Sequence, residues 1–544
     1  MLEFLNKTIR YINKFRPRQI GIAIYFFFLL ISLLTYNYRP LACDMAEYLN
    51  NPFRVLFGDL PYIDFWLLFP PGEVLLPTLI YKIFGVNTDV LRVATILISC
   101  LVPVAAFYLG RLLFRENGKS IVAAFIFFFF SVVSNYEGPD YLHIFLLFII
   151  LAVYYLIKNF EVENNFKYVF LSGLFFALAF CFKLYEVGGV YAGMFLLLLW
   201  HEISRKNDLK GILKTVLLFI SSLLLPLLMY IILYGNSTLL ALNEVVFESV
   251  KNGTSMNVPY FNDLYYVVRS LSNDWGRIVN NSEISAFAYL FYHSLVFIVT
   301  FGYYIVPFIA VIIFIFWIFR KPAKKEAFIV SIIFIWGLMS FPKALGRSDL
   351  AHLAPSVAPF MLLLFYLGYQ SVSKTIKNVA KTVVIVMFLS LFFPFFKVYT
   401  VLSNPVECVS APNGAVPFKN ESDRADFENT VNYILENTDK NDYIFVTPWD
   451  APPIYALCER RNPTYYDSLN DLIIRRNEEK QKQIIRDILA HDTKLIIHNP
   501  DWGYDNKPEQ QFRVACDLLQ DFFDNECILV ARFGFYYIYT VNEK

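Results

Sequence analysis

The stretch IGIAIYFFFLLISLLT, from Ile20 to Thr35, carries no charged residue, and Asp44-Met-Ala-Glu47-Tyr48 follows shortly after it. An apolar run of this length is typical of a transmembrane helix. Carboxylates next to hydrocarbon are costly unless they are hydrated, paired or used, so an acidic motif at this place predicts a functional site. Lys7, Arg10 and further basic residues precede the run, and no small-residue cleavage site follows it. The run is therefore expected to be a retained anchor.

The composition predicts a polytopic membrane protein. Of the 544 residues, 57% are hydrophobic, and the chain contains 56 Phe and 36 Tyr. The mean hydropathy of +0.48 is too high for a soluble globular protein. The formal net charge is only +1, which argues against a nucleic-acid partner because such proteins carry a basic stripe.

Apolar windows predict about eleven transmembrane helices. They lie near residues 20–36, 92–113, 120–135, 142–157, 168–184, 187–201, 212–234, 297–319, 327–343, 354–372 and 381–399. The apolar segment from Glu73 to Phe84 is short for a span. We expect it to form an interfacial or partly inserted helix.

Basic residues cluster in alternate short loops and so predict the orientation of the chain. The clusters include Arg111 and Arg115, Lys206 and Lys210, Arg320 and Lys321, and Lys374 and Lys377. They define a cytoplasmic side that also holds residues 1–19. The first loop (37–91), a loop near 235–296 and the tail (401–544) are then extracytoplasmic, and residues 20–400 form the transmembrane domain.

The tail has the pattern of a small α/β domain. Strand-like runs occur at 442–447, 494–498 and 535–541, and helical periodicity occurs at 424–436, 471–490 and 510–523. Four cysteines of the tail could pair in three ways, and no zinc-binding spacing occurs in the chain.

Ionisable residues from separate loops are predicted to gather at the extracytoplasmic face. A carboxylate there could accept the proton of an attacking hydroxyl, and cations could hold the charge of a phosphate leaving group. The candidates for proton transfer are Asp44 and Glu47. The candidates for phosphate binding are Lys183, Arg347, His352 and Lys343, and the further site candidates are Asp64, Asp140 and Tyr62.

In the order of its motifs, the chain resembles the GT-C membrane glycosyltransferases, in particular the bacterial branch related to protein O-mannosyltransferases and lipid A aminoarabinose transferases. The resemblance rests on the following segments: Asp44 to Glu47, Gly58 to Asp64, Phe69-Pro-Pro-Gly72 through Gly85, Leu171 to Lys183, and Arg347 to Pro355. Asp44 and Glu47 stand three residues apart, whereas relatives often have two adjacent acidic residues.

The resemblance implies an inverting glycosyltransferase of the bacterial cell membrane, with its active site facing outward. The donor would be a polyprenyl-phosphate sugar, and the acceptor a lipid, a glycan or a protein. Asp44 would be the base or the group that orients the acceptor, and Lys183 and Arg347 would bind the donor phosphate. No cofactor is expected, because Lys and Arg alone can stabilise a monophosphate leaving group.

Other classes of function stay open at this stage. A channel or transporter would place ionisable residues in the middle of its spans and would show paired broken helices. A non-catalytic factor for lipid-linked glycan assembly would bind lipid without turnover. A transferase that uses a diphosphate donor would be distinguished by its dependence on a metal ion.

Overall fold

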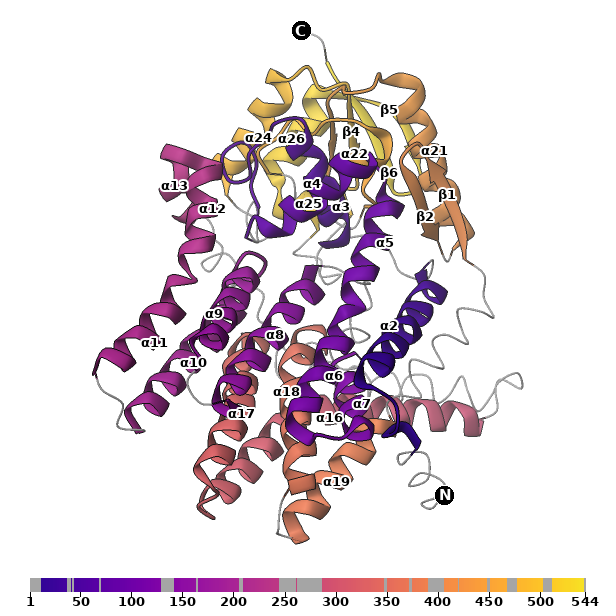
Figure 1. The fold of residues 1–544 in the computed structure, drawn as a ribbon. Helices are drawn as coiled ribbons and strands as arrows, with labels where there is room; N and C mark the ends of the chain where they lie inside the picture. The colour runs from indigo at the N-terminus through magenta and orange to yellow at the C-terminus, as the bar shows by residue number, and fades with distance from the viewer. Residues whose placement is uncertain are drawn as a thin grey trace. The chain divides into compact units, whose positions relative to one another are not determined.

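The structure is a computed structural model of the whole chain, drawn in Figure 1. It describes the residues 11–36, 41, 44–67, 70–128, 141–162, 165–204, 209–243, 261, 286–346, 350–370, 374–389, 406–418, 420–447, 451–466, 477–501 and 511–542.

The chain divides into two compact units. Unit 1 comprises residues 1–33, 97–228 and 256–403, and unit 2 comprises residues 34–96, 229–255 and 404–544. Unit 2 thus combines the first loop with the tail, which are far apart in the sequence. The sequence did not suggest this grouping.

Unit 1 is built from apolar helices that pack along their lengths. In Figure 1, α8, α9 and α10 run side by side, and α17 packs against both α10 and α18. Aromatic side chains fill the contacts, as where Phe127 stacks on Trp336 with ring centroids 5.1 Å apart. The helices are α2 (Pro17–Leu34), α6 (Leu101–Phe114), α7 (Asn117–Phe127), α8 (Tyr141–Glu161), α9 (Phe166–Phe180), α10 (Leu184–Ser204), α11 (Leu209–Ser221), α16 (Ala286–Ile318), α17 (Lys324–Gly346), α18 (Leu350–Gln370) and α19 (Lys374–Leu389).

Two further apolar helices, α5 (Thr88–Ser99) and α12 (Leu224–Tyr234), cross from one unit to the other. Seven of the eleven predicted spans are long and apolar enough to cross a membrane. The predicted spans 120–135, 168–184 and 354–372 correspond to shorter apolar helices, α7, α9 and part of α18. The last predicted span, 381–399, lies partly outside the described residues. The protein is a multi-pass membrane protein, as predicted, and the count of eleven stays a prediction.

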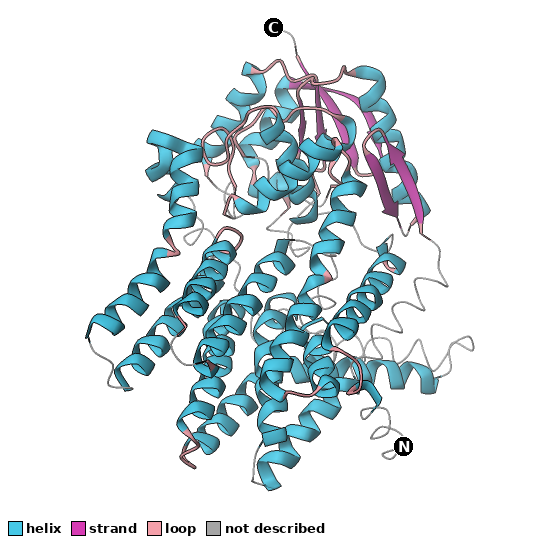
Figure 2. Cartoon of the chain, viewed as in Figure 1, coloured by secondary structure: helices cyan, strands magenta, loops and turns pink. Residues whose placement is uncertain are grey.

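Unit 2 contains all the strands that the structure describes, drawn in magenta in Figure 2. One sheet has the order β3-β4-β6-β5, with β3 parallel to β4 and the other pairs antiparallel, and β1 and β2 form a hairpin. The strands are β1 (Glu407–Ala411), β2 (Gly414–Phe418), β3 (Ile444–Val446), β4 (Leu495–His498), β5 (Cys527–Phe533) and β6 (Tyr536–Val541). The predicted small α/β domain is confirmed.

The helices of unit 2 come from all three of its segments. Those of the tail are α21 (Glu421–Asn437), α22 (Ile454–Cys458), α24 (Glu478–Ala490), α25 (Phe512–Ala515) and α26 (Asp517–Glu526). Those of the first loop are α3 (Asp44–Leu56) and α4 (Gly72–Phe84), and η3 (Gly235–Ser237) and α13 (Thr238–Asn243) follow α12. Helix α4 is the short helix that the sequence predicts, and its membrane depth stays a prediction.

The core of unit 2 joins the sheet to the first loop. Phe445 of β3, Ile496 of β4 and Phe523 of α26 are fully buried in it, and Trp66 of the first loop belongs to the same cluster with an exposure of 4%. Burying a large aromatic side chain contributes roughly 1.5 to 3 kcal/mol. The first loop therefore supplies part of the hydrophobic core of the tail.

The four cysteines of the tail, Cys408, Cys458, Cys516 and Cys527, are all free in the structure.

A second contact within unit 2 depends on Gly414. The carbonyl of Asn413 accepts hydrogen bonds from the backbone N–H (2.8 Å) and the hydroxyl (3.1 Å) of Thr88, at the start of α5. Gly414 has a φ of +142°, and a Cβ on it would lie 2.0 Å from Oγ1 of Thr88. Only glycine allows both this backbone conformation and this close approach.

We predict that Gly414→Ala lowers the melting temperature of the purified protein, with a cost of about 1 to 3 kcal/mol from backbone strain and a further cost from the clash. Gly85→Ala is the matched control, because Gly85 also has a positive φ, +85°, but nothing lies within 4 Å of its added Cβ. Differential scanning fluorimetry of both variants gives the comparison. Equal losses of melting temperature in the two variants would show that the close approach of Gly414 to Thr88 does not contribute to stability.

Candidate functional site

The acidic motif lies on helix α3, which begins at Asp44. Glu47 lies three residues later and therefore on the same face of the helix, with a half-buried side chain. Apart from Glu47 and Asn50, the residues from Met45 to Arg54 are buried. The helix is thus an internal element of unit 2, and it presents the acidic motif from a fixed backbone.

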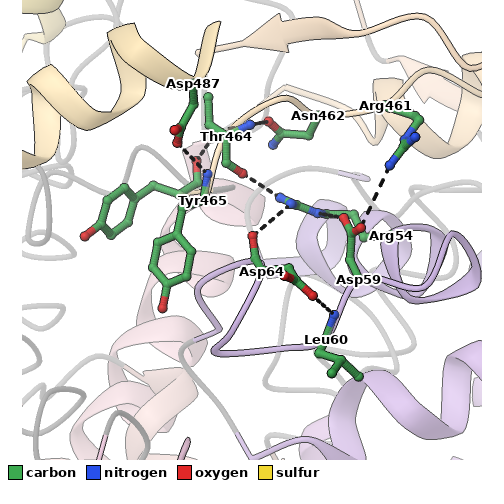
Figure 3. Close-up of polar contacts among 10 residues, drawn as sticks. Arg54, Asp59, Leu60, Asp64, Arg461, Asn462, Thr464, Tyr465 and Asp487 are labelled. Atoms are coloured by element: carbon green, nitrogen blue, oxygen red, sulfur yellow. Dashed lines mark hydrogen bonds and ion pairs between the residues drawn. The ribbon is translucent and has the colours of Figure 1, made fainter. Parts of the chain in front are cut away.

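Arg54 anchors the carboxyl end of α3. It lies seven residues after Glu47, which places it on the same helix face, and its exposure is 8%. Its Nε donates to Oδ2 of Asp59 at 2.9 Å, and its Nη1 donates to the carbonyl of Thr464 in the tail at 2.8 Å. A third bond reaches the carbonyl of Asp64 at 3.3 Å. Figure 3 shows the guanidinium between the first loop and the tail segment.

Backbone and side-chain hydrogen bonds extend this contact between the first loop and the tail. The N–H of Trp66 donates to the carbonyl of Tyr465 at 2.7 Å, and the hydroxyl of Tyr465 donates to the carbonyl of Tyr62 at 3.2 Å. The N–H of Tyr465 donates to Asp487 at 3.1 Å (Figure 3). Burial raises the pKa of the Asp487 carboxyl, and this N–H opposes the rise. The loop residues 59–66 and the tail residues Thr464, Tyr465 and Asp487 therefore hold each other in place.

Asp59 and Asp64 have different surroundings. Besides its bond to Arg54, Asp59 lies 3.9 Å from the guanidinium of Arg461, which stacks over the ring of Tyr443. Asp64 is exposed, and its carboxylate accepts a hydrogen bond from the N–H of Leu60 at 2.8 Å. The structure thus gives Asp64 a role in shaping the turn, and its role in chemistry stays a prediction.

Tyr62 is held in an unusual backbone conformation. Its φ is +66°, its exposure is 1%, and its N–H donates to the carbonyl of Phe65 at 2.6 Å. A left-handed conformation in a bulky residue costs of order 1 to 3 kcal/mol and persists where the surrounding structure requires it. The turn, and not the intrinsic backbone preference of tyrosine, therefore sets the position of the buried Tyr62 side chain.

The predicted phosphate-binding residues fall in unit 1 or outside the described residues. Lys183 follows α9 and immediately precedes α10, and its exposure is 4%. Lys343 lies in α17 and His352 in α18. Arg347 and Asp140 lie outside the described residues. The convergence of these groups with Asp44 and Glu47 stays a prediction, since the latter belong to unit 2.

Other polar groups of unit 2 are explained by the fold. His498 is fully buried between the hydroxyl of Thr447 (2.9 Å) and the side chain of Gln520 (3.0 Å), and burial lowers its pKa to about 4. It is a neutral core histidine at physiological pH. Within the ranges that the structure describes, no group of three or more His, Cys, Asp or Glu side chains could hold a metal ion. The expectation that no metal is needed stays a prediction.

Comparison with known proteins supports the resemblance of the sequence. The family model of the dolichyl-phosphate-mannose-protein mannosyltransferases matches residues 69–230. The crystal structure of ArnT from Cupriavidus metallidurans bound to undecaprenyl phosphate matches with a TM-score of 0.54 and 10% identity, over 97% of this chain and 98% of ArnT. The chain has a GT-C fold of the mannosyltransferase and ArnT type.

Two further solved structures show weaker similarity to this GT-C chain. The oligosaccharyltransferase of Archaeoglobus fulgidus, tethered to an acceptor peptide, matches with a TM-score of 0.49 and 12% identity, over 96% of this chain and 74% of its own. The structure of ArnT from Cupriavidus metallidurans in the apo state matches with a TM-score of 0.40 and 11% identity, over 97% of this chain and 98% of ArnT. No sequence match among curated proteins is significant. The family match and the fold indicate a membrane glycosyltransferase.

Sequence reasoning missed the residues that hold the first loop against the tail. Arg54 and Tyr465 carry no motif, and their partners are hundreds of residues away. The sequence holds one local signal for Arg54. It follows Asp44 by ten residues and Glu47 by seven, which places all three on one face of a helix. Glu73, a carboxylate in the first turn of the apolar helix α4, is not among the site residues that the sequence predicts.

We predict that Arg54→Met destabilises unit 2 by about 2 to 3 kcal/mol, because it leaves buried hydrogen-bonding partners unsatisfied. Arg54→Lys keeps the charge beside Asp59 but loses the branched geometry, so we expect an intermediate loss. Lys482→Met is the control, since that exposed side chain makes surface ion pairs worth under about 1 kcal/mol.

Limited proteolysis of the tail and the melting temperature of each purified variant measure the effect of Arg54. If Arg54→Met and Lys482→Met behaved alike in both measurements, Arg54 would not be an anchor of the first loop.

Proposed function

We propose that this protein is an inverting glycosyltransferase that moves a sugar from a polyprenyl-phosphate donor to an acceptor at the extracytoplasmic face of the membrane. The observation that carries the proposal is the match of residues 69–230 to the dolichyl-phosphate-mannose-protein mannosyltransferases. The GT-C fold supports it, since ArnT has the same fold and its structure contains undecaprenyl phosphate.

The reaction is a single displacement at the anomeric carbon of the donor sugar. A hydroxyl or amine of the acceptor forms the new bond as the bond from carbon to phosphate oxygen breaks, which inverts the configuration. The bonding electrons leave with the polyprenyl phosphate, and a carboxylate takes the proton of the acceptor. Asp44, at the first residue of α3, is the proposed base, and Glu47 on the same helix face is its companion.

Cations are needed where the phosphate leaves. As the glycosidic bond breaks, negative charge grows on the phosphate, and lysine or arginine side chains stabilise it most strongly where water is excluded. Lys183, buried between α9 and α10, suits this role, and Arg347 could bind two phosphate oxygens at once. Lys343 and His352 are the next candidates.

The orientation follows from the basic loops of the sequence and places the tail and the first loop outside the cytoplasm. Bacterial origin is part of the same proposal and rests on the resemblance alone. The proposed sugar is a hexose or a pentose, and the proposed acceptor is a lipid, a glycan or a protein.

We expect Asp44→Asn to lower the rate of sugar transfer about 100-fold to 10,000-fold, because the amide keeps the size of the side chain but cannot accept the proton. Transfer from a radiolabelled polyprenyl-phosphate sugar measures the effect, with Glu47→Gln as a companion. Glu478→Gln in the exposed first turn of α24 is the control and should transfer at the wild-type rate. Activity of a folded Asp44→Asn protein within tenfold of wild type would assign the base elsewhere.

We expect Lys183→Ala and Arg347→Ala to weaken donor binding or to slow transfer by roughly 1.5 to 3 kcal/mol each, the contribution of one charge-assisted hydrogen bond. Arg347→Lys should also be impaired, because lysine cannot make the two-pronged contact. The affinity for the sugar-free polyprenyl phosphate isolates the phosphate contact, and Lys321→Ala in a predicted cytoplasmic loop is the control. Unchanged affinity and turnover in both alanine variants would point to Lys343 and His352 instead.

A further inference from the structure

Three tyrosines and a carboxylate from separate segments of unit 2 form what we term the tyrosine cluster: Tyr62, Tyr230, Tyr234 and Glu73. The rings of Tyr62 and Tyr234 meet edge to face with centroids 6.0 Å apart, and those of Tyr230 and Tyr234 lie 5.7 Å apart. The pKa of the Tyr62 phenol lies well above its usual value, first because it is buried and then because Tyr230, Tyr234 and Glu73 add negative potential.

The members of the tyrosine cluster are all buried. Their exposures are 1% for Tyr62, 6% for Tyr230, 6% for Tyr234 and 4% for Glu73. Glu73 lies in the first turn of α4, directly after Pro70-Pro71-Gly72 and inside the segment that the mannosyltransferase family matches. Tyr234 is the last residue of α12. The cluster thus joins the first loop to the end of an apolar helix.

The hydroxyl of Tyr234 is buried and has no hydrogen-bond partner within the described part of the chain. More than about 90% of buried polar groups in proteins have a partner, and an unmet one costs about 1 to 3 kcal/mol. Two other buried phenols of unit 2 are satisfied: Tyr81 donates to the carbonyl of Leu49 at 3.1 Å, and Tyr48 pairs with Thr95 at 3.0 Å. Among the described residues, nothing satisfies the Tyr234 hydroxyl, so it is available to a bound ligand.

The chemistry of the cluster selects the kind of partner. Phenol hydroxyls both donate and accept hydrogen bonds, and a carboxylate accepts them from hydroxyl groups. The aromatic rings add apolar faces with a polar edge, which suit a ring that carries both C–H and O–H groups. A phosphate would meet the like charge of Glu73, which disfavours it. A neutral, hydroxyl-rich ring fits these groups best.

We propose that Tyr62, Glu73 and Tyr234 form a subsite for the hydroxyl groups of a sugar ring, with the Tyr234 hydroxyl as a specificity-determining contact. The inference rests on the proposed function and adds to it the residues that recognise sugar. The ring could be the transferred sugar of the donor or a sugar of a glycan acceptor, because both present the same hydroxyl chemistry.

The melting temperature of a Tyr234 variant distinguishes a ligand-binding role of the Tyr234 hydroxyl from a purely structural one. Tyr234→Phe removes only a hydroxyl that no described residue satisfies, so we expect the melting temperature of the purified protein to stay the same or to rise. Tyr81→Phe is the matched control, since it removes a hydroxyl that is bonded within the protein and should lower the melting temperature. A drop for Tyr234→Phe as large as that for Tyr81→Phe would mean that its hydroxyl has a structural partner, and would overturn the proposal.

Ligand-induced stabilisation then tests sugar recognition without turnover, because a ligand that binds the folded state raises its melting temperature. The probes are an undecaprenyl-phosphate sugar, sugar-free undecaprenyl phosphate and a free oligosaccharide. We expect Tyr234→Phe to bind one sugar-bearing probe about tenfold more weakly than wild type and to bind the sugar-free lipid equally well. Weakening with the lipid-linked probe assigns the donor sugar, and weakening with the oligosaccharide assigns the acceptor.

The outcomes distinguish failure of this proposal from failure of the proposed function. Wild-type affinity of Tyr234→Phe for every sugar-bearing probe, in a protein that transfers sugar, would overturn the subsite alone. A wild-type protein that neither binds nor transfers from any sugar-bearing probe would overturn the proposed function and the subsite together.

Discussion

The hydrogen bonds of Arg54 make the first loop and the tail one folded unit. A guanidinium buried this far would be costly without partners, and here it has an aspartate and two backbone carbonyls. Arg54 belongs to the helix that begins with Asp44 and carries Glu47. The position of helix α3, which carries the acidic motif, is therefore set in part by contacts that the tail provides, and the tail supports the candidate site.

The same dependence explains why the first loop carries buried polar and strained groups. Tyr62 adopts a left-handed backbone conformation, and its carbonyl accepts a hydrogen bond from the hydroxyl of Tyr465 in the tail. Trp66 enters the core of the sheet domain, and the start of α5 bonds to the hairpin at Asn413. Each contact restricts a segment that would otherwise be a long loop. Such rigidity is what a site needs to hold a reacting hydroxyl against a carboxylate.

The sequence predicts what local patterns encode. Hydropathy finds the long helices, as in α2 and α17, and β-branched runs find β3, β4 and β6. The sequence did not predict the strands β1, β2 and β5. Strands β1 and β2 each contain a single β-branched residue, and β5 is largely exposed at the edge of its sheet. The bond from Arg54 to Thr464 joins residues 410 apart, and no local pattern reports it. The tyrosine cluster was missed for the same reason, apart from Tyr62.

The most direct test of glycosyl transfer from a polyprenyl-phosphate donor is mass spectrometry of the lipids that co-purify with the wild-type protein, before any substrate is added. We expect a polyprenyl phosphate that carries a hexose or pentose, enriched over the bulk membrane extract and depleted in the Lys183→Ala and Arg347→Ala variants. Co-purification of a diphosphate-linked sugar, or of bulk phospholipid alone from a protein that transfers sugar from a soluble nucleotide donor, would contradict it.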